Sequence, residues 1–168
     1  MILTGSEIRQ EVKNGRIFVE PFNETCLNPN SYNYHLGKRI KIAPLEVIDP
    51  KQKMAWNEIE IPEEGLILQP NYLYLGHTLE KIGSSYFVTS LIGRSSIGRL
   101  GLYLQLSADL GQLGAIHRWT LEMTVIQPLR IYKGMIVGQV SFWKPIGKII
   151  SYNGEYGNVS TPGESKIF

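Results

Sequence analysis

The sequence predicts a mostly β protein: a distorted β-barrel or jelly roll with a short amino-terminal helix and a flexible carboxyl-terminal arm. Two observations predict this class. After residue 15 the chain consists of short runs rich in Ile, Val, Leu, Tyr and Phe, separated by Pro, Gly and Asn. Such evenly punctuated runs are typical of strands in a sandwich or barrel. At 168 residues the chain is also long enough for one domain with a substantial core.

The amino-terminal helix is expected at Ser6–Lys13. Thr4 and Glu7 have the spacing of a capping box, and Ile8 and Val12 lie four residues apart on one helical face. The Asn-Gly pair that follows is a typical helix end. We therefore expect a short amphipathic helix packed on a β domain.

The remaining elements are strands, each a run of β-branched, aromatic or aliphatic residues. We assign residues 1–150 to a single domain and 151–168 to a mobile lid arm, because the arm is rich in Gly, Ser, Asn and Tyr and has few aliphatic side chains to bury. The expected strands are Ile17–Val19, Tyr32–Leu36, Arg39–Ile42, Glu58–Ile61, Leu66–Leu68, Tyr72–Thr78, Phe87–Leu91, Leu102–Leu106, Arg118–Ile126, Leu129–Ile131 and Ile136–Trp143.

Charge and cysteine content exclude several classes of protein. Lys and Arg number 17 and Asp and Glu number 15, so the net charge of +2 provides no broad basic field for nucleic acid. The single cysteine, Cys26, cannot form an internal disulfide, which favours a reducing, cytoplasmic setting. The first residues lack the pattern of a secretory signal, and no run approaches the ~20 apolar residues that cross a bilayer. We expect neither a nucleic-acid nor a membrane partner.

The segment GRSSIGRLG, residues 93–101, carries unusual chemistry for a stretch flanked by apolar residues. Arg94 and Arg99 offer forked donors suited to phosphate or carboxylate oxygens, and Ser95 and Ser96 add hydroxyls and backbone amides. The glycines allow a ligand to approach the backbone closely. The segment is either an anion-binding element or a surface loop whose arginines are merely solvated.

The segment RWTLEMTVI, residues 118–126, alternates between apolar and polar side chains. Trp119 and Leu121 belong to the apolar set, whereas Thr120 and Glu122 belong to the polar set, so Glu122 is expected on the polar face of a strand. A carboxylate there is either a solvated surface residue or an acid–base group placed for catalysis.

Six segments follow one another in the order of a known family: MILTGSEIRQEVKNGRIFVEPF, NPNSYNYHLG, HTLEKI, GRSSIGRLGL, SADLGQLGAIHRWTLEM and YKGMIVGQVSF. Through them the chain resembles the dCTP deaminase family, the deaminase branch of the trimeric dUTPase-like fold, along nearly its whole length. The resemblance implies a dUTPase-like domain that assembles as a homotrimer, with a pyrimidine nucleotide bound at each boundary between subunits.

The resemblance also implies roles for individual residues. Four catalytic positions, which hold and activate a water against C4 of cytosine, are matched by Ser95, Arg99, the carbonyl of Ala108, and Glu122. Contacts with phosphate, the pyrimidine edge or other parts of the substrate are implied for Arg94, Ser95, Ser96, Thr120, Leu121, Glu122 and Gln139.

The chemistry implied by this resemblance proceeds without a catalytic zinc. Zinc-dependent cytosine deaminases use a His-x-Glu and a Pro-Cys-x-x-Cys motif, neither of which the chain contains. His35, His77 and His117 have no common metal-ligand spacing, so we expect no metal held by protein side chains. Mg²⁺ is expected only on the phosphates of the substrate.

Two regions depart from the family pattern. Gln112 stands where the family commonly has an aspartate that contacts the deoxyribose 3′-hydroxyl. In the arm, Glu155 and Val159 replace a cation and a glutamine that grip phosphates, and a carboxylate beside a triphosphate repels it. Four residues of the arm remain compatible with a lid over the substrate: Tyr152, Tyr156, Pro162 and Lys166. Lys166 is expected to supply a substitute positive charge.

Several aromatic and sulfur-containing residues have simpler expectations. His117 follows the changed segment and is expected either to line the pocket or to fill an ordinary polar role. The tryptophans, Trp56, Trp119 and Trp143, are expected to pack. Cys26 is expected to be a small buried hydrophobe.

The leading hypothesis is metal-independent hydrolytic deamination of a cytosine deoxynucleotide. The favoured reaction converts dCTP to dUTP with release of ammonia. Gln139 leaves room for further hydrolysis to dUMP. The alternatives are a protein that binds or sequesters a nucleotide without turnover on the same fold, and a deaminase or diphosphatase for a different nucleotide. The retained Glu122, Arg99 and Ser95 favour the enzyme. The changed Gln112, Glu155 and Val159 favour the binding protein.

Overall fold

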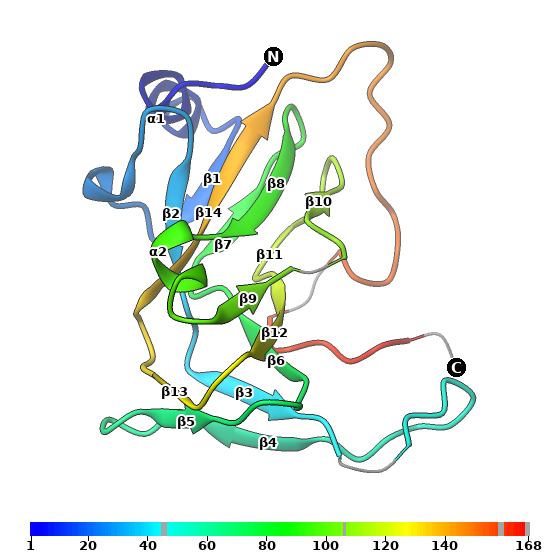
Figure 1. Cartoon of the computed structure of the whole chain (residues 1–168). Helices are drawn as coiled ribbons and strands as arrows, with labels where there is room; N and C mark the ends of the chain where they lie inside the picture. The colour runs from blue at the N-terminus through cyan, green and yellow to red at the C-terminus, as the bar shows by residue number, and fades with distance from the viewer. Residues whose placement is uncertain (45–46, 106, 158–159, 167–168) are drawn as a thin grey trace.

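The computed structural model describes residues 1–44, 47–105, 107–157 and 160–166. Within these residues the protein has fourteen strands, two α-helices and one 3₁₀ helix (Figure 1), so the prediction of a mostly β fold with a short amino-terminal helix is confirmed. The elements are α1 (Gly5–Lys13), β1 (Phe18–Glu20), η1 (Glu24–Cys26), β2 (Tyr32–His35), β3 (Arg39–Ile42), β4 (Asn57–Glu60), β5 (Leu66–Leu68), β6 (Tyr74–His77), β7 (Lys81–Gly83), β8 (Val88–Gly93), α2 (Ser95–Gly98), β9 (Leu102–Leu104), β10 (Leu110–Gly111), β11 (Ile116–His117), β12 (Thr120–Val125), β13 (Leu129–Ile131) and β14 (Ile136–Trp143).

The described strands form four antiparallel sheets. A five-stranded sheet has the order β4-β3-β6-β12-β9, and a four-stranded sheet has the order β10-β8-β14-β2. Two smaller sheets, β1-β7-β11 and β13-β5, complete the domain. Consecutive strands often belong to different sheets, so residues distant in sequence meet in space.

The five-stranded sheet places the polar residues of the site on one face. Along β12 the residues alternate between half-buried and buried, with Thr120 and Glu122 in the half-buried set and Leu121 fully buried. In the register with β6, Thr120 lies opposite His77 and Glu122 lies opposite Leu75. Paired residues share a face of a sheet, so the predicted placement of Glu122 on the polar face of a strand is confirmed.

The core lies between the sheets and consists of aliphatic and aromatic side chains. Tyr32, Tyr34 and Phe142 are its largest fully buried residues. The hydroxyl of Tyr34 donates to the carbonyl of Ile92 at 3.1 Å, which satisfies the one polar atom of that ring. Burying a large apolar side chain contributes roughly 1.5–3 kcal/mol to stability, so these aromatic residues anchor β2 against β14 and β8.

The predicted helix is one residue longer than expected, and its predicted cap is wrong. Thr4 occupies the N-cap position but makes no side-chain cap bond; its Oγ1 pairs with Ser6 Oγ at 3.0 Å instead. Ile8 is fully buried, as the helical spacing predicted. Neither described helix could span a bilayer, since α1, the longer, has nine residues.

All eleven expected strands have counterparts, with ends displaced by up to two residues where they are described. The strand expected at Leu102–Leu106 ends at Leu104, and its position 106 lies outside the described residues. The prediction missed β7, β10, β11, α2 and η1, which have two to four residues each. Such short elements carry too few residues for a periodic pattern, so only their tertiary partners define them.

Candidate functional site

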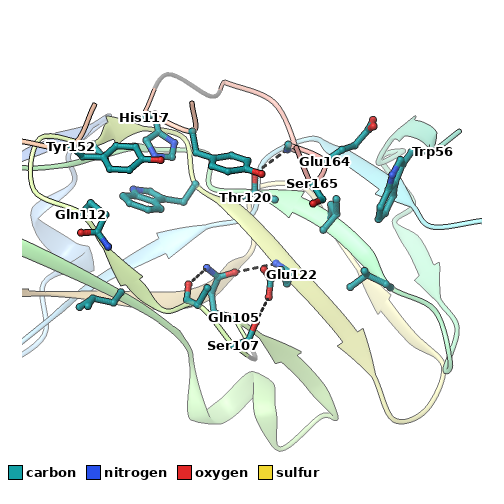
Figure 2. Close-up of a pocket in the computed structure, with 18 residues that line it drawn as sticks. Trp56, Gln105, Ser107, Gln112, His117, Thr120, Glu122, Tyr152, Glu164 and Ser165 are labelled. Atoms are coloured by element: carbon teal, nitrogen blue, oxygen red, sulfur yellow. Dashed lines mark hydrogen bonds between the residues drawn. The ribbon is translucent and has the colours of Figure 1, made fainter. Parts of the chain in front are cut away.

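The main pocket lies over the polar face of the five-stranded sheet and has a volume of about 700 Å³ (Figure 2). Strand β12 supplies Thr120 and Glu122, and the loop after β9 supplies Gln105, Ser107 and Ala108. Pockets of this size commonly hold a small-molecule ligand. The pocket therefore collects residues from two segments about 15 positions apart, as well as from the carboxyl-terminal arm.

Glu122 is half-buried in the floor of the main pocket, with its carboxylate held from one side. Ser107 Oγ donates to Glu122 Oε2 at 3.3 Å. The backbone N–H of Glu122 donates to Gln105 Oε1 at 3.0 Å, and the backbone N–H of Gln105 donates to the carbonyl of Glu122 at 3.1 Å. Figure 2 shows these groups side by side. Glu122 lines the pocket, where its carboxylate oxygens can accept hydrogen bonds from a bound molecule.

Gln105 also fixes the carbonyl of Ala108. Its Nε2 donates to that carbonyl at 3.2 Å, so one side chain connects Ala108 to the backbone of Glu122. Gln105 adopts a left-handed backbone conformation, with a φ of 53°, which is uncommon outside glycine. A carbonyl oxygen has two lone pairs, so Ala108 can accept a second hydrogen from a bound molecule.

One wall of the pocket consists of His117 and Trp119. Their rings lie 4.3 Å apart between centroids at an angle of 35°. The Nδ1–H of His117 donates to the carbonyl of Arg118 at 2.8 Å, and Trp119 Nε1 donates to the carbonyl of Ile82 at 2.9 Å. Burial lowers the pKa of His117, which favours the neutral ring. The wall is therefore a rigid, uncharged aromatic surface against which a planar base can stack.

The described part of the arm covers the main pocket. The backbone N–H of Tyr152 donates to the carbonyl of Leu113 at 2.7 Å, and that of Gly163 donates to Thr120 Oγ1 at 2.9 Å. Tyr152, Tyr156 and Glu164 line the pocket. Figure 2 shows this segment crossing above Thr120. The predicted mobility of the arm stays a prediction.

The pocket unites some of the residues expected at the site. It brings together Glu122, Ala108, Gln112 and Thr120, with the arm residues described above. Lys166 lies outside it, where its Nζ donates to the carbonyl of Glu155 at 3.1 Å and sits 5.2 Å from the centroid of the Tyr156 ring. Val159 lies outside the described residues.

The arginine and serine motif lies elsewhere on the same chain. Arg94, Ser95, Ser96 and Arg99 are exposed on and around α2, which packs against β9, and none of them lines the main pocket. The side chain of Leu121 faces the core, because it alternates with Glu122 along β12. Gln139 also lies outside the main pocket. It belongs to β14, and its Oε1 accepts a hydrogen bond from Ser31 Oγ at 2.9 Å.

The described lining of the main pocket carries no cationic side chain of Lys or Arg. Glu122 and Glu164 contribute two carboxylates to it. Glu164 is paired with Lys41 Nζ at 2.7 Å. Within the described residues no cluster of three His, Cys, Asp or Glu side chains is placed to hold a metal ion. A phosphorylated ligand in this pocket would need cations from outside it.

Sequence reasoning missed two residues that shape the pocket, Gln105 and Ser107. Gln105 falls inside the strand expected at Leu102–Leu106, although β9 ends at Leu104, and Ser107 follows that expected strand. The left-handed conformation of Gln105 has no marker in its residue type. Trp56 and Trp119 were expected to pack, and both also line the pocket. His117 lines it as well, in agreement with one of its two expected roles.

Comparison with known proteins defines the family. The family model described as dCTP deaminase-like matches residues 2–145. Three similar proteins share the name "dCTP deaminase, dUMP-forming". That of Hathewaya histolytica is 41% identical over 169 residues, covering 100% of this chain and 98% of the relative. Those of Clostridium acetobutylicum and Leptospira biflexa are each 41% identical, covering 94% and 93% of this chain and 91% and 90% of the relatives. The chain belongs to the dCTP deaminase-like family, as its motifs indicated.

A solved structure supports the fold. The crystal structure of 2′-deoxycytidine 5′-triphosphate deaminase from Agrobacterium tumefaciens matches with a TM-score of 0.66 at 18% sequence identity. The match covers 84% of this chain and 47% of the other, so this chain spans about half the length of that solved chain. At this identity the likeness concerns the arrangement of the strands.

Proposed function

We propose that this protein deaminates dCTP by hydrolysis, with release of ammonia and without a catalytic metal. The observation that carries the proposal is the placement of Glu122 and the carbonyl of Ala108 in one pocket, joined through Gln105. The names of the similar proteins support dCTP as the substrate. The neutral aromatic wall of His117 and Trp119 suits a pyrimidine ring.

In the proposed reaction, Glu122 acts as both base and acid. A water molecule donates one hydrogen bond to Glu122 and one to the carbonyl of Ala108, which directs its oxygen toward C4 of cytosine. As the C–O bond forms, Glu122 takes a proton from the water and gives it to N3. The remaining hydroxyl proton then passes through Glu122 to the amino group, the C–N bond breaks, and ammonia leaves a C4 carbonyl. The carboxylate ends unprotonated, as it began.

The missing cations are proposed to come from a second copy of the chain. Arg94 and Arg99 are exposed beside large apolar side chains that are also exposed on this region of the surface. Exposed apolar clusters of this kind mark protein interfaces, and a head-to-tail contact forms a closed ring when its rotation closes. We propose a homotrimer in which Arg99 and Ser95 of one subunit meet Glu122 of the next. The exposed apolar residues are Ile92, Leu100, Tyr103, Leu110 and Ile126.

The phosphates are proposed to bind at this subunit boundary. Arg94, Ser95 and Ser96 suit a triphosphate through forked and hydroxyl donors, and Mg²⁺ enters on the phosphates of the substrate. Gln112 lies in the pocket wall, where its amide can bond a sugar hydroxyl. We place the reaction in the cytoplasm, because the one cysteine, Cys26, is a free buried thiol.

The product is proposed to be dUMP as well as dUTP, in line with the names of the similar proteins. Incubation with dCTP, dCMP and CTP, followed by assays of ammonia and pyrophosphate, tests this. Ammonia together with pyrophosphate from dCTP indicates hydrolysis to dUMP, whereas ammonia alone indicates dUTP as the end product. Release of ammonia from none of the three would contradict the deaminase.

A second candidate is a protein that binds a nucleotide without turnover. Gln112 in the pocket wall and the exposed Glu155 favour it, because both weaken the expected grip on sugar and phosphate. Calorimetry with the same three nucleotides separates the candidates: tight binding in the absence of any ammonia would support the binding protein.

A further inference from the structure

A second cavity lies beside the main pocket and has a volume of about 660 Å³. Lys38, Arg39, Arg118 and Lys133 line it, and Glu60 is the one acidic side chain among its described lining residues. We call it the basic cavity. A cavity with four cationic side chains and one carboxylate in its wall attracts small anions.

The basic cavity shares the polar face of the five-stranded sheet with the main pocket. His77, in its wall, lies opposite Thr120 in the register of β6 and β12, and Thr120 lines the main pocket. The arm passes over both: Ser160 and Thr161 line the basic cavity, and Gly163 lines the main pocket. The two cavities are therefore neighbours with separate walls.

The cations of the basic cavity are available to a ligand. Arg118 has no carboxylate within 4.0 Å among the described residues, and its Nε donates to a backbone carbonyl at 2.9 Å. The other three cations are in ion pairs: Lys38 with Glu60 at 3.4 Å, Arg39 with Glu58 at 3.1 Å and Lys133 with Glu63 at 2.5 Å, with both partners of each pair at least a third exposed. Exposed ion pairs contribute little to stability, so a phosphate group can replace these carboxylates.

His77 supplies an independent sign of a missing partner. Its side chain is 6% exposed, and its Nδ1–H donates to the carbonyl of Thr78 at 2.9 Å. Its Nε2 is buried and has no hydrogen-bond partner among the described residues. A buried polar atom without a partner destabilises a protein unless a ligand or water completes the bond.

The surroundings of His77 define what that partner is. Burial lowers its pKa, and the positive charges of Arg118 and Arg39 lower it further, so the ring is neutral at neutral pH. Because Nδ1 carries the hydrogen, Nε2 accepts one. The ring fits closely against Gly37, where an added Cβ would lie 2.1 Å from His77 Cε1. The ring is therefore fixed in place, and its Nε2 needs a hydrogen-bond donor.

We propose that the basic cavity binds the phosphate group of a small molecule, at a site separate from the main pocket. Arg118 and Lys38 supply the charge, and the P–O–H of a monoanionic phosphate donates to Nε2 of His77. With a dianionic phosphate the ring takes a proton from solvent and donates from Nε2 instead. Both arrangements satisfy Nε2 and place negative charge among the cations. This site does not depend on the proposed deamination.

The first test measures phosphate binding by calorimetry on the full-length protein, at constant ionic strength. We expect saturable binding of inorganic phosphate that the double variant Lys38→Gln/Arg118→Gln weakens at least about tenfold, since each lost charge-assisted bond costs roughly that much affinity. The matched control Lys13→Gln/Lys148→Gln removes two exposed cations elsewhere and is expected to bind within about twofold of the unchanged protein. Equal losses in both double variants, or no binding by the unchanged protein, would overturn the proposal.

The second test needs no variant and so does not depend on folding. His77 and His117 both donate Nδ1–H to the carbonyl of the next residue, but His117 lies in the main pocket. In ¹⁵N NMR, added phosphate is expected to shift Nε2 of His77 and to leave Nε2 of His117 unchanged. A shift at His117 alone would place the phosphate in the main pocket and contradict a separate site.

The source of the phosphate group is distinguished by two arms of the same titration. One uses inorganic phosphate, and the other uses a nucleoside monophosphate, UMP. Tighter binding of UMP at His77 identifies a nucleotide ligand, whereas tighter binding of inorganic phosphate identifies the free ion. A response of His77 to neither means that only water fills the cavity, and the proposal fails.

Discussion

The main pocket and the basic cavity lie side by side on one sheet, yet their walls differ in charge. The described wall of the main pocket holds two carboxylates and no Lys or Arg, whereas that of the basic cavity holds four cations and one carboxylate. Each also contains a buried histidine whose Nδ1–H bonds to the next carbonyl, His117 in one and His77 in the other. Within the part of the chain that the structure describes, Nε2 of His77 is one of the buried atoms without a hydrogen-bond partner.

This difference in charge indicates where the positive charge that binds phosphate comes from in each cavity. Glu122 lines the main pocket, but neither Arg94 nor Arg99 of its own chain does. We propose that those arginines come from a second subunit together with the phosphates. The basic cavity carries its own cations and needs only the ligand. One site is thus expected to depend on assembly and the other is not.

The largest effect is expected from Glu122→Gln. The amide cannot take a proton from water, so ammonia release from dCTP should fall by about 10³-fold, while nucleotide binding is retained. Steady-state ammonia assays and calorimetry measure the two quantities. Glu63→Gln, which changes an exposed carboxylate, is the control and should keep its deaminase activity. Glu122→Gln should still bind phosphate in the basic cavity. Loss of activity below tenfold would contradict the role of Glu122 as the base.

The dependence on assembly is tested by mixing inactive variants. Arg99→Gln alone is expected to lose about 10²-fold in turnover. When it is refolded in equal amounts with Glu122→Gln, about a quarter of the sites receive both native residues if neighbouring subunits share each site. Activity of about a quarter of the unchanged protein is therefore expected. A mixture as inactive as its components would show that each chain carries a complete site.

A smaller effect is expected from Gln105, which connects Glu122 to the carbonyl of Ala108. Gln105→Ala removes both side-chain bonds and should lower kcat about tenfold with little change in KM, because it misplaces the water rather than the nucleotide. Gln105→Asn is the matched control for the backbone, since Asn tolerates the left-handed conformation but is too short to bridge. If Asn restores full activity, the backbone conformation and not the bridge is what matters.

The smallest effect concerns stability against pH. Because burial lowers the pKa of His117 below its ordinary 6.5, the unfolded chain binds more protons there than the folded protein below that pH. Stability is therefore complete above 6.5 and falls with the pH, with an expected decrease of about 2–4 °C in Tm between pH 7 and 5. Thermal unfolding of His117→Gln should show a flatter profile over this range. An unchanged profile would assign the pH dependence to His77 or to other groups.

The sequence predicts a strand of this fold when the alternation of apolar and polar residues in that strand is long enough. Strand β12 has six residues of strict alternation, so both the element and the side of Glu122 were predictable. Strands β10 and β11 have two residues each and are defined by pairing with β8 and β7. The cap of α1 failed although the spacing was right, because the Thr4 hydroxyl pairs with Ser6.

The candidate site divides in the same way. The motif GRSSIGRLG and the position of Glu122 can be predicted from the sequence, because specific chemistry requires specific residue types. The sequence does not predict that Gln105 bridges Glu122 and Ala108, because the bridge depends on a loop conformation with a positive φ.

The amino-acid sequence by itself determined the strand-rich fold, the amino-terminal helix, the family and the residue types of the site, because alternation and ordered motifs are properties of a linear chain. Only the tertiary structure decided that Glu122 and Arg99 of one chain lie apart, and that Lys38, His77 and Arg118 surround a cavity. Those relations depend on which strands pair across long sequence separations, and that choice is made by packing of the whole core.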